Sequence, residues 1–168
     1  MVRLLGALLV AGACSWLGFS RAAQLRRNVT TLDEMESGFT LLLQRLELGL
    51  SLPRLLAELA ERTDGPAREL FGFCAHALNQ TDREAFSCLW RRGVENLQTM
   101  GCAEKNALLP LGETLGQCDL EEQKRGIRAV LERLEDFRLR AEETARRQGQ
   151  VYRMLGLSGG AFLVILLL

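Results

Sequence analysis

The chain has 168 residues, of which 48% are hydrophobic, and its 21 Lys and Arg balance 21 Asp and Glu to give zero net charge. This length supports one domain. Neutrality argues against broad nucleic-acid binding, because displacing counterions from phosphates needs a basic surface. The charges are unevenly placed, since none occurs from Leu4 to Ser20 or from Met154 to Leu168. The chain therefore divides into two apolar ends, residues 1–20 and 151–168, and a charged middle, residues 21–150.

The N-terminal end contains sixteen successive apolar or small residues, from Leu4 to Phe19. As a helix this run would be about 24 Å long, slightly shorter than the ~30 Å hydrocarbon core of a bilayer. With Trp16 at one interface and Arg3 and Arg21 reaching the headgroups, we expect it to form a transmembrane helix. Two other interpretations stay open: a cleaved secretory signal peptide, or a lipoprotein signal that ends at Cys14. Either would make the protein a secreted or lipid-anchored helical bundle.

The C-terminal end, from Met154 to Leu168, contains fifteen uncharged residues. It reaches spanning length only if Val151 and Tyr152 contribute. A buried core helix is the alternative interpretation, but such a helix would carry a polar stripe, and here only Ser158 is polar. We therefore expect a second transmembrane helix at this end.

Arginines flank both apolar ends on the side of the middle region. They are Arg21, Arg26, Arg27, Arg146, Arg147 and Arg153, against Arg3 alone on the other side. The positive-inside rule then predicts that the middle region is cytoplasmic. The five cysteines agree with a reducing compartment, because their number is odd and no C-x-x-C occurs. We expect them to be buried, reduced thiols within helices.

The first half of the middle region has the apolar spacing of helices. Apolar residues recur there at steps of three and four, which predicts a long helix that ends at Gly49. They are Leu25, Val29, Leu32, Met35, Phe39, Leu43, Leu46 and Leu50. Ser51 and Pro53 begin a short second helix that ends at Thr63–Gly65. A third helix is expected to begin at Pro66.

The second half contains two capping signals. Thr81-x-x-Glu84 predicts the start of a fourth helix, with Gly101 as its C-terminal stop. A short helix follows in residues 103–115, where Pro110 would break or kink it. Asp119-x-x-Glu122 predicts the start of a last long helix that runs into the C-terminal end.

These elements predict an all-α fold, because no β-branched alternation of period two appears. Both apolar ends enter the membrane from one face, so the two long helices should lie side by side as an antiparallel, coiled-coil-like pair near the bilayer. Shorter helices fill the connection between them. The stripes on the long helices serve either as scaffolding or as a surface for a homo-oligomer.

The residues that carry chemistry are sparse. The single histidine, His76, has no cysteine or carboxylate at the i+4 spacing of a helical metal site. No G-x-x-x-x-G-K-[ST] loop, G-x-S-x-G elbow or G-x-G-x-x-G loop follows a predicted strand. We therefore expect no catalytic residue, no metal and no cofactor.

Four blocks of sequence resemble one known family. They are Trp16-x-Gly18-Phe19, Leu46-x-x-Gly49-x-Ser51-Leu52, Leu111-Gly112-x-x-Leu115-Gly116-x-x-Asp119-x-x-x-Gln123 and Tyr152-x-x-Leu155-Gly156-x-x-x-Gly160. Together they make nearly the whole chain similar to stage III sporulation protein AB, a membrane protein family of endospore-forming bacteria.

This resemblance implies a non-enzymatic role in a sporulation-specific, secretion-like channel between mother cell and forespore. The middle region is similar to the cytoplasmic domain of F-type platform proteins of type II secretion and type IV pilus systems. The implied partners are a secretion-type ATPase, stage III sporulation protein AA, and other membrane proteins of the channel. The implied location is the mother-cell side of the membrane around the forespore.

The family motifs also supply candidate sites. Gly49, Ser51 and Leu52 form a candidate turn between helices. The second candidate is a corner made of Gly112, Gly116, Asp119 and Gln123. Either this corner is only a well-formed connection between helices, or it is exposed at the end farthest from the membrane and docks the ATPase.

Overall fold

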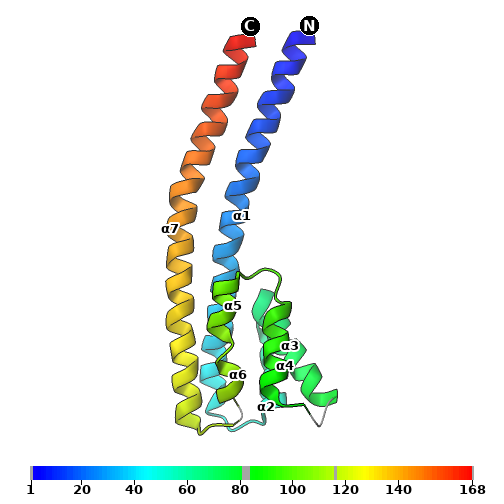
Figure 1. Cartoon of the computed structure of the whole chain (residues 1–168), viewed down its shortest axis with the longest axis vertical. Coiled ribbons are helices and arrows are strands. Elements are labelled where there is room, and N and C mark those ends of the chain that lie inside the picture. The colour runs from blue at the N-terminus through cyan, green and yellow to red at the C-terminus, as the bar shows by residue number, and fades with distance from the viewer. Residues whose placement is uncertain (1, 81–83, 116, 168) are drawn as a thin grey trace. The chain divides into compact units, whose positions relative to one another are not determined.

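The computed structural model describes the backbone of residues 2–80, 84–115 and 117–167. Side chains are described at Ser20, at Met154 and within 23–148, except at 81–83 and 116. The helices are α1 (Val2–Leu46), α2 (Leu52–Arg62), α3 (Gly65–Gln80), α4 (Phe86–Asn96), α5 (Cys102–Leu108), α6 (Leu111–Thr114) and α7 (Leu120–Leu167). The described residues contain no strand, which confirms the all-α prediction (Figure 1).

The chain divides into two compact units. Unit 1 combines Met1–Val29 with Leu139–Leu168, and unit 2 is Thr30–Arg138. The two predicted transmembrane segments fall in unit 1, and their side chains, apart from Ser20 and Met154, lie outside the described residues. Within the part of the chain that was described, no helix combines the length and the apolar character that crossing a membrane requires. Both transmembrane helices and the coiled-coil pairing near them stay predictions.

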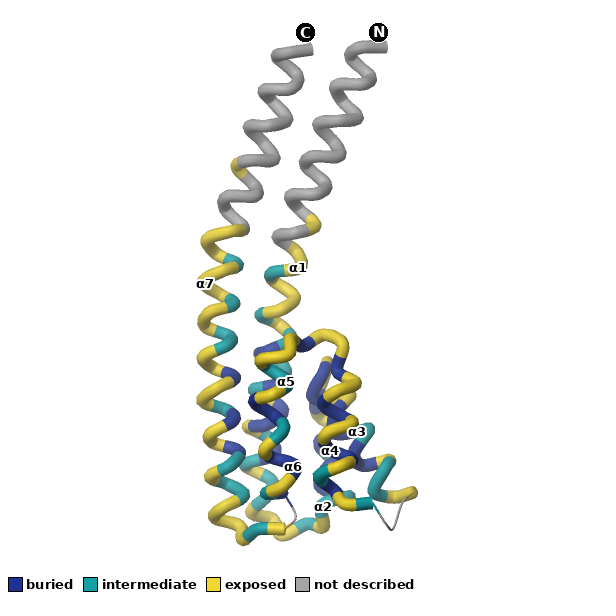
Figure 2. The backbone as a smooth tube through the Cα atoms, in the orientation of Figure 1, coloured by how far each residue is buried: buried dark blue, intermediate teal, exposed yellow. Residues whose placement is uncertain are grey.

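An aromatic cluster forms the core of unit 2. Phe39, Phe71 and Trp90 have almost no exposed surface. The ring centroid of Phe39 lies 5.7 Å from that of Phe71 and 6.2 Å from that of Trp90, both edge to face, the arrangement that aromatic quadrupoles favour. The Trp90 Nε1–H donates to the Leu108 carbonyl at 2.9 Å. These contacts join α1, α3, α4 and α5 around one buried centre (Figure 2).

The apolar stripe predicted for α1 is buried at its centre. Leu32, Met35 and Phe39 face the core as expected, but the next buried residue is Leu42, whereas the predicted Leu43 is only half-buried. Gly38 lies on the same face, and a Cβ added there would be 2.6 Å from the Ala67 Cβ of α3. The glycine therefore permits the close approach of α1 to α3.

The start predicted for the fourth helix is wrong. Helix α4 begins at Phe86, with Ala85 in an extended conformation before it, and Thr81 lies outside the described residues. The Glu84 carboxylate does not cap this helix but lies 3.5 Å from the Arg92 guanidinium. Helix α4 therefore begins two residues after Glu84, so the predicted capping box does not lie at its start.

Gly101 was expected to end α4, but it precedes α5. Helix α4 ends at Asn96, and the Gly101 N–H donates to the Glu104 carboxylate at 2.7 Å. This bond satisfies a backbone donor at the start of α5, as the second half of a capping box does. Pro110 separates α5 from α6, so the predicted helix break is confirmed.

Among the four cysteines whose side chains are described, the expectation of burial holds at one, while the side chain of Cys14 lies outside the described residues. Cys74 is buried in α3, and burial raises the pKa of its thiol to about 12. Cys88 and Cys102 are exposed, and Cys118 is half-buried. Burial was expected because the cysteines fall within predicted helices, but Cys102 stands at the first position of α5 and is exposed there.

Candidate functional site

The predicted corner at the start of α7 is closed by three hydrogen bonds. The Glu122 N–H donates to Asp119 Oδ1 at 2.8 Å, so Asp119 caps the helix. The Gln123 N–H donates to the Asp119 carbonyl at 3.0 Å, and Gln123 Nε2 donates to the Cys118 carbonyl at 2.8 Å. These bonds fix the direction in which α7 leaves the preceding turn. Asp119 is exposed and Gln123 is half-buried.

Gly112 contributes to the corner by packing. It is buried in α6, and a Cβ added there would lie 2.8 Å from Trp90 Cδ1 and 3.0 Å from Trp90 Cβ. A side chain would therefore push α6 away from α4. Gly112 supports the corner from inside and presents no surface to a partner, while Gly116 lies outside the described residues.

The other predicted turn connects α1 to α2. Gly49 has φ +65°, a left-handed conformation that residues with a Cβ rarely adopt. Ser51 has an extended backbone and its carbonyl accepts from the Leu55 N–H at 2.9 Å, while its hydroxyl makes no capping bond. Leu52 is the first residue of α2.

Lys124 joins the turn after α1 to the start of α7. Its Nζ lies 2.8 Å from Glu47 Oε1 and 3.2 Å from Glu121 Oε1, and the side chain is only 12% exposed. Hydrogen bonds to Glu47 and Glu121 raise the pKa of Lys124. The hydrogen bond from Lys124 lowers the pKa of Glu47. The two sites predicted separately from the sequence therefore meet at one end of unit 2 (Figure 1).

Two exposed leucines belong to this end. Leu48 and Leu120 are 58% and 43% exposed. We call the surface formed by Leu48, Gly49, Asp119, Leu120 and Gln123 the end face. The end face combines apolar and polar side chains, and the ion pairs of Lys124 with Glu47 and Glu121 join the two segments that form it.

Sequence reasoning singled out neither Lys124 nor the exposed leucines. One signal was available, because Lys124 is one of only two lysines in a chain with nineteen arginines. Lysine offers a compact ammonium group that fits between two carboxylates, whereas the planar guanidinium prefers bidentate pairing. The pairing with Glu47 itself joins residues 77 positions apart, so no local pattern could reveal it.

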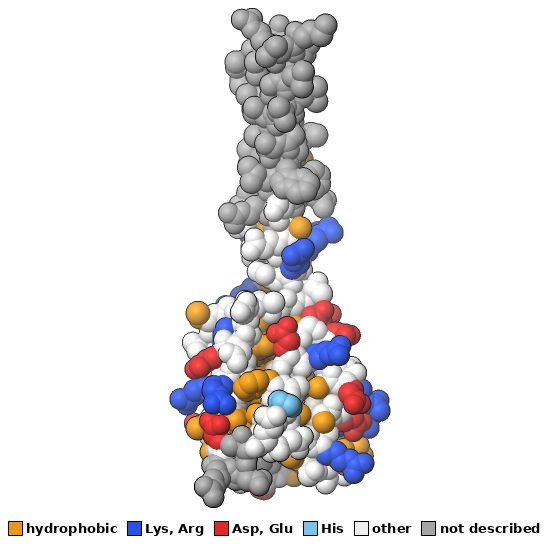
Figure 3. Space-filling view, turned by 90° about the vertical axis from the view of Figure 1, so that its right-hand side faces the viewer, with side chains coloured by type: hydrophobic (Ala, Val, Ile, Leu, Met, Phe, Trp, Pro, Cys, Tyr) orange, Lys and Arg blue, Asp and Glu red, His pale blue; other side chains and the backbone are white. Residues whose placement is uncertain are grey.

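Groups that could bind a metal are not gathered in the described part of the chain. His76 is exposed on α3 (Figure 3). No three His, Cys, Asp or Glu side chains among those described are placed to hold an ion together. The described residues of the end face contain no nucleophile paired with a base.

Comparison with known proteins gives one consistent family. The family model for stage III sporulation protein AB matches residues 3–168. Stage III sporulation protein AB of Bacillus subtilis (strain 168) is 24% identical over 172 residues, which cover 100% of each chain. A solved structure of a stage III sporulation protein AB has a similar fold, with a TM-score of 0.52, 22% identity and coverage of 76% of this chain and 97% of that one. This chain therefore belongs to the stage III sporulation protein AB family.

Proposed function

We propose that this protein is a non-enzymatic membrane platform in a secretion-like channel of sporulation, and that it couples a cytoplasmic ATPase to the membrane components of the channel. Membership of the stage III sporulation protein AB family supports a role in sporulation. The observation that carries the proposed role is the end face, where Lys124 connects the turn after α1 to the start of α7. A partner that moves this surface acts on both long helices at once.

The proposed arrangement in the membrane has two spans with the middle region in the mother-cell cytoplasm. Uncharged runs at both ends and the arginines beside them support it. The mass of the intact protein extracted from membranes distinguishes this arrangement from a secreted or lipid-anchored bundle. Loss of the first thirteen or so residues, or an added lipid on Cys14, would contradict the two-span arrangement.

The partner proposed for the end face is stage III sporulation protein AA, the secretion-type ATPase implied by the family resemblance. Exposed leucines and a capped helix start suit protein binding, because an apolar contact surrounded by polar groups gives both affinity and orientation. Leu48 and Leu120 lie outside the core, so their replacement tests binding without emptying a buried site.

The experiment is a pull-down of the purified ATPase with full-length protein in lipid nanodiscs. We expect the double variant Leu48→Ser, Leu120→Ser to lose most of the bound ATPase while its far-UV circular dichroism stays that of the wild type. Leu139→Ser is the matched control, because Leu139 is also exposed, at 50%, but lies on α7 in unit 1. Undiminished binding by the double variant would contradict the proposal.

A further inference from the structure

The charges of the chain are divided unequally between the two units. Unit 1 carries eight of the 21 basic residues and two of the 21 acidic residues, Glu142 and Glu143. Unit 2 carries the other thirteen basic and nineteen acidic residues. Unit 1 is therefore strongly basic, although the whole chain is neutral. A surface with this excess of one sign of charge attracts ligands of the opposite sign.

Six arginines of unit 1 lie beside the uncharged ends of α1 and α7. We call them the basic collar: Arg21, Arg26, Arg27, Arg146, Arg147 and Arg153. Every charged residue of the segments 21–32 and 144–153 belongs to the collar. Orientation in a membrane does not require such uniform charge, because it follows Lys and Arg and is little affected by Asp and Glu. A uniformly positive surface instead favours an anionic ligand.

The collar side chains that the structure describes lie on the surface. Arg27 of α1 and Arg146 of α7 are both exposed. The Arg147 guanidinium lies 2.7 Å from the Glu143 carboxylate, but the two side chains are 79% and 60% exposed. Solvent screens this ion pair, so it is weak. A phosphate group can therefore approach the collar and accept two parallel hydrogen bonds from one guanidinium.

Helix geometry places the collar near lipid headgroups in the two-span arrangement proposed above. At ~1.5 Å per residue, Arg27 stands about 10 Å along α1 from Ser20, the last residue of the first uncharged run. By the same rise, Arg146 stands about 12 Å along α7 from Met154, where the second run begins. The headgroup layer adds roughly 5–8 Å to each side of the hydrocarbon core, and charges interact over a Debye length of about 8 Å at physiological ionic strength. Lipid phosphates are therefore within range of both arginines.

We propose that the basic collar binds anionic phospholipid headgroups and prefers them to zwitterionic ones. The inference rests on the proposed two-span arrangement, because the collar lies beside a bilayer only if both ends insert. Clusters of roughly four to eight basic residues next to a membrane helix recognise anionic lipids in this way. Because the collar contains residues of both α1 and α7, bound anionic lipids join the two helices at the membrane surface.

The test uses full-length protein in nonionic detergent micelles that contain equal amounts of phosphatidylglycerol and phosphatidylcholine with the same acyl chains. Native mass spectrometry gives the ratio of the two lipids bound to the protein. We expect the wild type to retain mainly phosphatidylglycerol. Arg27→Gln, Arg146→Gln should lower this preference by roughly tenfold or more, because each basic residue near an anionic surface contributes about fivefold. Arg27→Lys, Arg146→Lys should keep most of the preference, because both charges remain.

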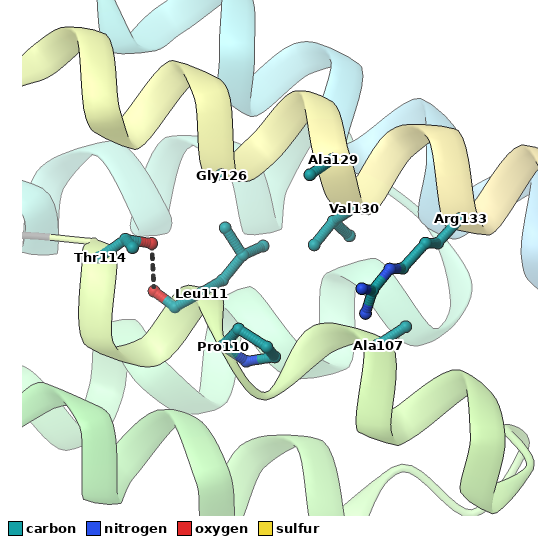
Figure 4. A pocket seen from close by; sticks show the side chains of 8 residues that line it. All are labelled: Ala107, Pro110, Leu111, Thr114, Gly126, Ala129, Val130 and Arg133. Atoms are coloured by element: carbon teal, nitrogen blue, oxygen red, sulfur yellow. Dashed lines mark hydrogen bonds between the residues drawn. The ribbon is translucent and has the colours of Figure 1, made fainter.

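The matched control is Arg128→Gln, Arg133→Gln, which removes two exposed arginines of α7 from unit 2. Figure 4 shows Arg133 among the residues that line a small hollow between α7 and the α5–α6 segment, outside the collar. This variant has the same net charge as Arg27→Gln, Arg146→Gln and should keep the wild-type lipid preference. All four arginines are exposed, and glutamine is a good helix former, so the circular dichroism of both variants should be that of the wild type.

Equal retention of the two lipids by the wild type would overturn the proposal, as would an equal loss of preference in the control variant. A loss of self-association in Arg27→Gln, Arg146→Gln with an unchanged lipid ratio would also overturn it, because the collar would then bind an acidic surface of a second copy. If glycerol 3-phosphate in solution abolished the preference, the collar would bind a free anion and not the membrane. Failure of the two-span arrangement gives a different result, since the intact mass would then show a cleaved or lipid-bearing N-terminus.

Discussion

Lys124 Nζ and Glu47 Oε1 lie 2.8 Å apart and hold the start of α7 against the turn that follows α1. A second carboxylate, that of Glu121, lies 3.2 Å from the same ammonium group. The Lys124 ammonium can donate to both carboxylates at once. It thereby holds the turn after α1, which contains Glu47, at a fixed position along the first turn of α7. The end face is therefore held both by this contact and by the hydrogen bonds that close the corner at Asp119.

We expect Glu47→Gln to lower the thermal stability of the protein at pH 7. Lys124 lowers the pKa of Glu47 in the folded state. The Glu47 carboxylate therefore contributes to folding stability above the pKa of the unfolded state, and this contribution is lost as the pH falls through the folded pKa. The difference between variant and wild type should therefore vanish in acid. Melting followed by circular dichroism across a pH series checks this.

The matched control for that series is Glu84→Gln. Glu84 and Arg92 form a longer pair at 3.5 Å, and Arg92 is 57% exposed whereas Lys124 is 12% exposed, so this variant should change the melting temperature less. Lys124 has the opposite dependence on pH, because its pKa is raised in the folded state. Its contribution to folding stability is present below the pKa of the unfolded state and is lost as the pH rises through the folded pKa. If Glu47→Gln and Glu84→Gln lower the melting temperature equally, the Lys124–Glu47 pair is not the more stabilising of the two.

Gly112→Ala should destabilise the protein by about 1–3 kcal/mol, the usual cost of overpacking a core. The added methyl would lie 2.8 Å from Trp90 Cδ1, and the rigid indole cannot move without disturbing its bond to the Leu108 carbonyl. Gly72→Ala is the control, because its methyl would meet only the Ala60 Cβ at 3.7 Å. That variant should be neutral or more stable by about 0.5–1 kcal/mol. Urea unfolding measures both.

Asp119→Ala should cost about 1 kcal/mol, because the Glu122 N–H at the start of α7 loses its acceptor. Asp119→Ser keeps a capping oxygen and should recover most of the loss. If the Asp119 carboxylate also contacts the ATPase, Asp119→Ser will keep wild-type stability and still bind the ATPase less well. Unfolding measurements and the pull-down, performed on the same two variants, separate the two roles.

The cysteines should differ in their reaction with iodoacetamide at pH 8. Cys88 and Cys102 are exposed and should be alkylated first. Burial and the nearby Glu122 carboxylate raise the pKa of Cys118, so its smaller thiolate fraction should slow its reaction. Cys74, with its pKa raised to about 12, should react only after unfolding. Peptide mass spectrometry over time gives the order, and early alkylation of Cys74 would contradict the packing of α3.

Local signals predicted the fold better than the site. Asp119 and Pro110 act where the sequence placed them, because a cap and a proline break depend on neighbours within one turn. Thr81-x-x-Glu84 is wrong as the start of α4 because the backbone is still extended at Ala85 and the helix begins at Phe86. Pairings such as Lys124 with Glu47, and the packing of Trp90 on Gly112, join distant segments and have no signature in a single sequence.

Trp90 gives this protein an internal optical reporter. The chain contains only two tryptophans, Trp16 and Trp90, so a Trp16→Phe variant emits from the buried indole alone. That indole contacts Phe39 and Phe86, lies against Gly112 and donates to the Leu108 carbonyl. Its emission wavelength would therefore report any loosening of α6 from α4 without an added label.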